Sequence, residues 1–179
     1  MKKIYLGCDL FIDGQRKQAV SVKDKIIKGL EIYNKINGTD HKVSIYNPAE
    51  NLEINDKSAG FTTGAEILLQ DYKRLKESDY LIALMDTEDL GLASEMGIAF
   101  ERGIPIFQLY TDIRLGGNDK QDKIKGLQDD VFQNDFLYIN KLVTGLSYVD
   151  KLGKHYETPL IYKKEEDLIE EVIKYLTNG

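Results

Sequence analysis

The run YLIALM at residues 80–85 is apolar at every position, and it narrows the possible folds more than any other part of the chain. A strand that is apolar on both faces is typical of the centre of a parallel sheet, where helices cover both sides. Segments with helical periodicity precede and follow it, at residues 63–76 and 92–102. Because parallel strands need crossover connections, this order predicts βαβ units.

The remaining segments continue the alternation. Residues 3–6, 43–46 and 105–110 are predicted strands, and residues 16–35 form a predicted helix. Two more helices are predicted, one carrying Ile124, Leu127 and Val131 and one with the stripe Leu168, Ile169, Val172, Ile173 and Leu176. Residues 49–62 have no clear period and are predicted to be a loop, whereas residues 134–146 fit either a strand or a helix.

These patterns predict an α/β fold, in which a doubly wound, mostly parallel sheet of about five strands has helices on both faces. The 179 residues contain no repeat, linker or composition break, so we expect one domain over residues 1–179.

Charge and composition exclude several classes of function. The net charge of −6 argues against binding to a nucleic-acid polymer or an anionic membrane, which need a basic surface. No apolar run reaches the roughly 20 residues of a membrane span, and Asp9 interrupts the only segment that could resemble a signal peptide. One cysteine and two histidines predict neither a disulfide nor a zinc site. We therefore expect a cytoplasmic protein without a metal.

The topology predicts where a ligand would bind. In doubly wound sheets, ligands bind beyond the carboxyl ends of the strands. The loops that begin at Gly7, Asn47, Asp86 and Thr111 should therefore line the site. No glycine-rich fingerprint for a dinucleotide or a nucleoside triphosphate is present.

Acidic residues occur where apolar residues are expected. Glu95 belongs to the predicted core-facing stripe of its helix, together with Leu92, Met96, Ala99 and Phe100. Asp71 has the same place in a stripe with Leu68, Tyr72 and Leu75, and Asp89 lies in the turn six residues before Glu95. A desolvated but ionised carboxylate is what a nucleophile requires. Asp89 could instead simply cap the helix, Asp86 could be a solvated turn residue, and the stripe acids could lie at the rim.

Several segments in this order resemble the nucleoside 2-deoxyribosyltransferase family. They are KIYLG at residues 3–7, YNP at 46–48 followed by Asn51, LEINDK at 52–57, Asp71 before KRLKESDYLIALMD, DLGLASEMGIA at 89–99, YTDIR at 110–114, and YIN at 138–140 before Gly145. The resemblance implies a flavodoxin-like fold and transfer of the sugar of a 2′-deoxynucleoside from one purine or pyrimidine base to another.

The resemblance also implies roles for single residues. Glu95 would be the nucleophile that forms a deoxyribosyl ester, Asp71 and Asp89 would contact and help protonate the base, and Tyr5 would hold the nucleophile. Asn140 would reach the sugar 5′-hydroxyl from a neighbouring subunit of a homo-oligomer. No metal or organic cofactor is implied. With the loops above, the motifs give eight predicted substrate-binding residues: Gly7, Asn47, Pro48, Asn51, Asp86, Gly91, Met96 and Asn140.

Two other functions remain open at this point. One is an N-glycosidase that hydrolyses 2′-deoxynucleoside 5′-monophosphates, for which Arg114 and Lys141 could bind the phosphate. The other is a non-catalytic, nucleotide-sensing module of flavodoxin-like fold. The preference between purines and pyrimidines cannot be read from residues 47–63.

Overall fold

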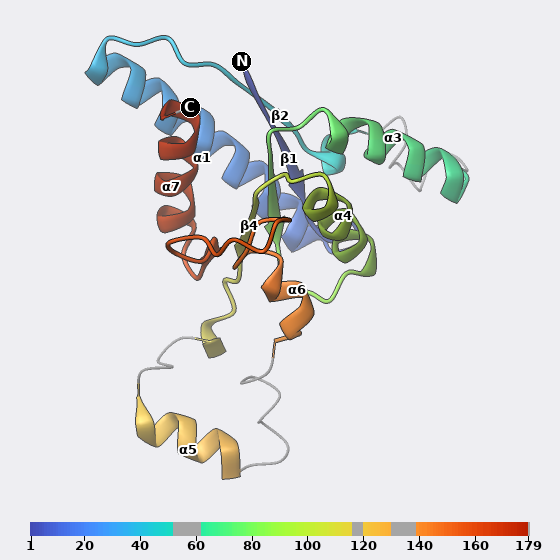
Figure 1. The fold of residues 1–179 in the computed structure, drawn as a ribbon, viewed down its shortest axis with the longest axis vertical. Coiled ribbons are helices and arrows are strands. Elements are labelled where there is room, and N and C mark those ends of the chain that lie inside the picture. Colours follow the sequence, from blue (N-terminus) through green and yellow to red (C-terminus); the bar gives the residue numbers. More distant parts are fainter. Residues whose placement is uncertain (52–61, 116–119, 130–138, 179) are drawn as a thin grey trace.

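A computed structural model, which describes residues 1–51, 62–115, 120–129 and 139–178, shows a parallel sheet between two layers of helices (Figure 1). Its elements are β1 (Lys2–Gly7), α1 (Asp13–Asn37), β2 (Val43–Tyr46), the 3-10 helix η1 (Pro48–Glu50), α3 (Gly64–Lys76), β3 (Tyr80–Leu84), α4 (Leu90–Glu101), β4 (Ile106–Leu109), the 3-10 helix η2 (Ile113–Leu115), α5 (Gln121–Asp129), α6 (Lys141–Gly145), β5 (Ile161–Tyr162) and α7 (Glu165–Thr177).

The sheet has five strands in the order β2-β1-β3-β4-β5, and every neighbouring pair is parallel. All five residues of β3 are buried, as the apolar run predicted. β1 pairs with β2 on one side and with β3 on the other, which aligns Tyr5 with Tyr46 and with Leu81. This order is that of a flavodoxin-like doubly wound sheet, and the predicted fold class is confirmed.

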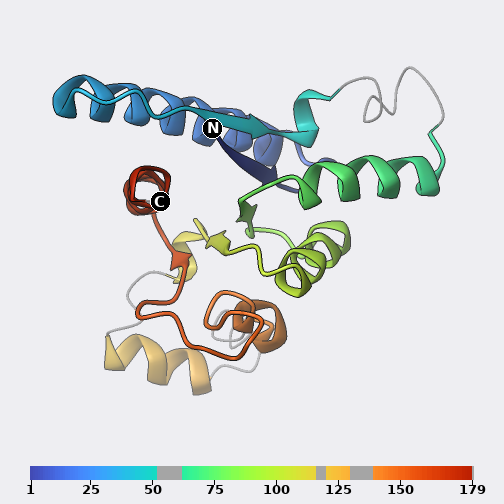
Figure 2. The same cartoon turned by 45° about the horizontal axis from the view of Figure 1, so that its top comes forward.

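Helices cover both faces of the sheet (Figure 2). α1 and α7 pack on one face, where they enclose side chains such as Ile4, Leu6 and Phe107. α3 and α4 lie on the other face, where Tyr5 joins a second buried cluster. Because side chains alternate along a strand, Tyr5 faces α4 while its neighbours in β1 face α1.

The fifth strand is not where the ambiguous segment lies. Residues 141–145 of that segment form the short helix α6, and residues 130–138, including Val131 and Asn134, lie outside the described part of the chain. The strand that completes the sheet is Ile161–Tyr162. Two residues are too few to show an alternating pattern, which explains why the sequence did not indicate it.

The predicted core stripe of α3 is wrong. Leu68 is 57% exposed and Tyr72 is 39% exposed, and Leu75 is the only fully buried member. Only the carboxyl-terminal end of α3 approaches the sheet, while its amino-terminal turns project beyond it (Figures 1 and 2). Asp71 therefore lies near the inner end of the helix without a continuous apolar stripe around it.

Two smaller expectations can be compared with the structure. Residues 49 and 50 of the predicted loop belong to η1, and residues 52–61 lie outside the described part of the chain. Within the described residues, no helix is long and apolar enough to cross a membrane.

Candidate active site

Tyr5 and Glu95 form the innermost pair of the candidate site. The Tyr5 hydroxyl donates a hydrogen bond to Oε1 of Glu95 at 2.5 Å. Tyr5 is fully buried in the interior strand β1. Glu95 comes from the second turn of α4, on the stripe where Leu92, Met96 and Ala99 are buried. The sheet and the helix thus fix the two partners independently, which holds the carboxylate in one orientation.

The surroundings of Glu95 disfavour its charged form. Burial raises its pKa to about 8, the hydrogen bond from Tyr5 opposes this rise, and the negative charges of Asp71 and Asp89 add to it. The pKa of Tyr5 is itself raised far above its usual value, first by burial and then by the charge of Glu95. Tyr5 therefore stays protonated and remains a hydrogen-bond donor to the carboxylate.

Gly7 allows Leu92 and Glu95 of α4 to pack closely against β1. A Cβ atom at position 7 would lie 2.5 Å from Cδ1 of Leu92 and 3.2 Å from Oε2 of Glu95. The first distance is shorter than real carbon contacts allow, so a side chain here would force either Leu92 or α4 to shift. The predicted role of Gly7 at the site has this structural basis, whereas a contact with substrate stays a prediction.

Asp71 approaches the site through Tyr46. The Tyr46 hydroxyl donates to Oδ1 of Asp71 at 3.4 Å and accepts a hydrogen bond from Nδ2 of Asn51 at 3.1 Å. The rings of Tyr46 and Tyr5 are 5.4 Å apart, and the guanidinium of Arg74 lies 5.3 Å from the centre of the Tyr46 ring. Asp71 and Asn51, which are 20 positions apart, thus meet at one tyrosine.

Asp89 caps the helix that carries Glu95. Its Oδ1 accepts a hydrogen bond from the backbone N–H of Leu92 at 2.5 Å, which satisfies a free donor of the first turn. A Cβ atom at Gly91 would lie 3.1 Å from the same carboxylate oxygen, so a larger residue would crowd it. The capping role, which the sequence left open, is real, and it also fixes the carboxylate at the edge of a pocket.

That pocket, with a volume of about 290 Å³, opens beside the carboxyl ends of β3 and β4. Its wall is shared by the loop after β3, the start of α4, the loop after β4 and α6. The wall includes the polar residues Asp86, Thr87, Glu88, Asp89, Tyr110, Asp112 and Asn140, together with Val143 of α6. Glu95 is not part of this wall, because its carboxylate faces Tyr5 and Gly7. Asp89 links the two places, since it lines the pocket and influences Glu95.

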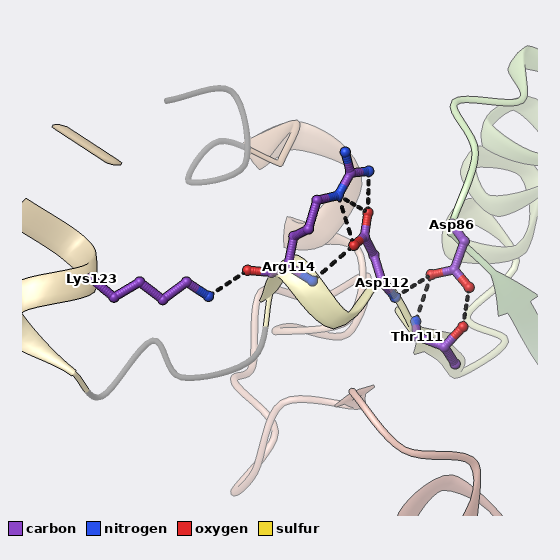
Figure 3. Close-up of polar contacts among 5 residues, drawn as sticks. All are labelled: Asp86, Thr111, Asp112, Arg114 and Lys123. Atoms are coloured by element: carbon purple, nitrogen blue, oxygen red, sulfur yellow. Dashed lines mark hydrogen bonds and ion pairs between the residues drawn. The ribbon is translucent and has the colours of Figure 1, made fainter. Parts of the chain in front are cut away.

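Asp86 holds two of these loops together (Figure 3). Its Oδ1 accepts hydrogen bonds from the backbone N–H groups of Thr111 at 2.5 Å and Asp112 at 3.1 Å, and its Oδ2 accepts from the Thr111 hydroxyl. Asp112 in turn pairs with Arg114, which holds the pKa of the Asp112 carboxyl at about 2. Nζ of Lys123 donates to the backbone oxygen of Arg114 at 2.6 Å.

The other predicted residues are dispersed. Asn140 lines the pocket beside Asp89 of its own chain, and its Oδ1 caps α6. Asn47 is buried, with its Oδ1 accepting from Ala49 and its Nδ2 unpaired within the described residues. Pro48 is buried in the first turn of η1, and Met96 is fully buried in the core beside Tyr5.

The structure adds residues that the sequence did not indicate. Gln108 and Ser147 are fully buried polar residues whose side chains connect β4 to the segment that follows α6, and Tyr110 bonds to Gln108 while lining the pocket. Thr87 lines the same pocket, and its buried hydroxyl has no partner among the described residues. Within those residues, no group of three His, Cys, Asp or Glu side chains could hold a metal ion.

The fold and the acidic site together define a flavodoxin-like α/β protein with a carboxylate poised at the end of its central strands. The sequence model of the nucleoside 2-deoxyribosyltransferase family matches residues 4–134, and the chain belongs to that family. Membership in this family makes the protein an enzyme that acts on nucleosides, either as a transferase or as an N-glycosidase. None of the curated proteins matches the chain.

Solved structures have the same fold. A conserved protein from Enterococcus faecalis V583 is 36% identical over 98% of both chains, with a TM-score of 0.74. The 2-deoxyribosyltransferase of Bacillus psychrosaccharolyticus is 18% identical over 93% of this chain and 90% of its own, with a TM-score of 0.57, and so shares the fold.

Proposed function

We propose that this protein transfers the 2-deoxyribosyl group of a 2′-deoxynucleoside to another purine or pyrimidine base, with retention, through a covalent ester on Glu95. The observation that carries the proposal is the hydrogen bond between the Tyr5 hydroxyl and the partly buried Glu95 carboxylate. Such exchange would salvage bases and nucleosides for nucleotide synthesis.

The first half-reaction breaks the bond between C1′ and the base nitrogen. As this bond lengthens, positive charge develops on the sugar ring, and an anionic carboxylate below C1′ stabilises that charge. Oε2 of Glu95, which does not accept from Tyr5, then forms the bond to C1′. Tyr5 keeps the other oxygen in place, so the nucleophile approaches from one direction.

The departing base takes the electron pair of the broken bond and needs a proton. Asp89 and Asp71 are the proposed donors, because both lie close enough to Glu95 to influence its pKa. In the second half-reaction an acceptor base attacks C1′ and gives its N–H proton to the aspartate that protonated the first base. The ester bond breaks, and both carboxyl groups return to their starting states. Two displacements on the same carbon give retention and ping-pong kinetics.

The charge of the pocket favours a neutral nucleoside over its 5′-monophosphate. Four carboxylates line it, those of Asp86, Glu88, Asp89 and Asp112, and its described lining contains no lysine, arginine or histidine. Arg114, which the sequence left as a candidate for phosphate, is paired with Asp112. A phosphate dianion would meet repulsion here, so the hydrolysis of monophosphates is the weaker hypothesis.

The predicted homo-oligomer and the cytoplasmic location stay predictions. Family resemblance implies that Asn140 acts across a subunit boundary, whereas the single chain places Asn140 in its own pocket. Activity measured over serial dilution distinguishes the two arrangements. A specific activity that falls as the oligomer dissociates would support action between subunits, and a constant specific activity in a monomeric sample would contradict it.

The decisive experiment incubates the protein with 2′-deoxyuridine and adenine and follows 2′-deoxyadenosine and free deoxyribose. We expect 2′-deoxyadenosine as the main product, and its loss in Glu95→Ala with the fold retained. Free deoxyribose without base exchange would show a hydrolase. A faster reaction of 2′-deoxyuridine 5′-monophosphate than of 2′-deoxyuridine would overturn the choice of donor. Base exchange at the wild-type rate in Glu95→Ala would disprove the role of Glu95.

A further inference from the structure

Gln108 is a fully buried amide in the middle of β4, whose other three residues are all apolar. A buried amide without hydrogen bonds is costly, so its two N–H groups and its oxygen need partners inside the protein. By strand alternation, Gln108 lies on the same face of the sheet as Ile106, which packs in the cluster below α4.

Each polar atom of the Gln108 side chain has found a partner. Nε2 donates to the backbone oxygen of Val143 at 2.9 Å and to the hydroxyl of Ser147 at 2.8 Å, while Oε1 accepts from the Tyr110 hydroxyl at 2.7 Å. The Ser147 hydroxyl donates onward to the backbone oxygen of Ile106 at 2.7 Å.

The donor and the acceptor of each hydrogen bond in this network around Gln108 are determined. Backbone oxygens can only accept, so Nε2 of Gln108 must face Val143, and the hydroxyl hydrogen of Ser147 must face Ile106. It follows that Oε1 faces Tyr110, which must donate. A set of bonds with a single arrangement holds its members more rigidly than one with alternatives.

These bonds hold α6 on the sheet. α6 has five residues, and an isolated helix of that length is unstable in water, so its position depends on tertiary contacts. Its carboxyl-terminal end is bound by Gln108 through Val143 and Ser147. Asn140 caps its amino-terminal end, and Asn140 and Val143 both line the pocket next to Asp89.

We propose that Gln108 is a positioning residue: by anchoring α6 through Val143 and Ser147, it keeps Asn140 and Val143 in the wall of the nucleoside pocket. This inference rests on the proposed function for the identity of the ligand, but the anchoring itself can be measured without ligand. Gln108 does not contact the pocket, so its effect on the ligand passes through α6 and Tyr110.

The test compares Gln108→Leu, which has a similar size but no amide, with the milder Ser147→Ala. Without ligand, we expect the amide hydrogens of residues 144–148 to exchange at least about tenfold faster in Gln108→Leu, with β1 and β3 unchanged. Ser147→Ala should give a smaller increase. Gln128→Leu makes the same change on an exposed position of α5 and should leave these rates unchanged.

Ligand binding supplies the second readout. In a Glu95→Ala background, where turnover is prevented, we expect Gln108→Leu to raise the Kd for 2′-deoxyadenosine and 2′-deoxyuridine by about tenfold. With Glu95 present, KM should rise by a similar factor while kcat changes by less than about threefold.

Either of two results would overturn the proposal: exchange rates of α6 that do not change in Gln108→Leu, or faster exchange without weaker binding. If Gln108→Leu fails to fold, Ser147→Ala decides by the same two criteria. An absence of base exchange in the wild type would count against the proposed function alone, because hydrogen exchange and Kd do not depend on turnover.

Discussion

The carboxylates of Glu95 and Asp112 both belong to the candidate site, but their surroundings shift their pKa values in opposite directions. Glu95 lies between β1 and α4 with an uncharged donor, Tyr5, as its partner, and burial raises its pKa to about 8. Asp112 lies in the loop after β4 with a cation, Arg114, as its partner, and that pairing lowers its pKa to about 2.

The comparison shows that the partner and the solvent decide what a carboxylate can do. Asp112 is ionised at neutral pH and paired with Arg114, so it can shape a loop and repel anions but has little reactivity. Glu95 is poorly solvated, and its charge has only a hydrogen bond to stabilise it, so it gains from developing positive charge nearby. Glu95 is therefore suited to catalysis, whereas Asp112 is suited to a structural role in its loop.

Removing the carboxylate of Glu95 should have the largest effect. We expect Glu95→Gln to reduce kcat for base exchange by about 10⁴-fold, because an amide can neither stabilise the sugar cation nor form the ester. The matched control is Glu101→Gln, an exposed position at the end of the same helix, which should keep wild-type activity. A loss of less than tenfold in Glu95→Gln would remove the distinction between the two acids.

Removing the donor should sharpen the comparison through pH. Activity requires the Glu95 carboxylate, so kcat/KM should rise with pH through a pKa of about 8. The Tyr5 hydrogen bond lowers that pKa, hence Tyr5→Phe should move the rise to higher pH and reduce the rate at pH 7 by about 10- to 100-fold. Tyr33→Phe, far from Glu95 in sequence and packed near His41, serves as the control. An unshifted profile would contradict this role of Tyr5.

Adding a side chain at Gly7, beside Glu95, should have the next largest effect. Gly7→Ala places a Cβ 2.5 Å from Leu92 and 3.2 Å from Glu95, so we expect about tenfold lower kcat and a free energy of unfolding lower by about 1–3 kcal/mol. Gly14→Ala, where no atom lies within 4 Å of the new Cβ, is the control for both measurements. Equal behaviour of the two variants would show that α4 moves away without consequence.

The raised pKa of Glu95 should also make the free energy of unfolding depend on pH. The folded pKa of Glu95 lies above its ordinary value of 4.5, so from about pH 4.5 to 8 the folded state holds a proton that the unfolded state has lost. Folding stability therefore falls with rising pH over this range. Urea unfolding should show Glu95→Gln gaining about 3–4 kcal/mol relative to wild type between pH 5 and 8. A constant difference between the two proteins would refute the raised pKa.

The smallest effect is expected from a substitution of Asp112. Asp112→Asn removes the pair with Arg114. Because the Arg114 side chain is exposed and the Asp112 side chain is only half-buried, we expect the melting temperature to change by less than about 2 °C at neutral pH. The lowered pKa of Asp112 means that its contribution is present above about pH 4 and is lost as pH falls through 2. A larger change in melting temperature at neutral pH would show that Asp112 is more than a loop residue.

The sequence predicted the fold and the place of Glu95 because both depend on long regular patterns. The apolar run of β3 and the stripe of α4 are predicted correctly, since every residue of β3 is buried and Leu92, Met96 and Ala99 are buried along α4. The stripe of α3 failed because only one end of that helix is covered, which periodicity cannot show. Strand β5 is too short for any pattern.

The polar anchor of α6 could not be found in advance for a different reason. A single glutamine in a strand is ordinarily interpreted as a solvent-facing position, and its partner Ser147 is 39 residues away. The match between an amide, a hydroxyl and two backbone oxygens exists only in three dimensions. The same holds for the approach of Asn51 to Tyr46 and Asp71.

The pairing of β1 on both sides joins the integrity of the sheet to the chemistry. If β1 slipped by one residue during folding, Tyr5 would turn toward α1 and an aliphatic neighbour would lie under Glu95. A molecule with this shifted register would retain most of its helical circular dichroism signal, but no tyrosine hydroxyl would donate a hydrogen bond to Glu95. After refolding, recovered turnover would therefore count the correctly threaded molecules, which a spectroscopic measure of secondary structure would overestimate.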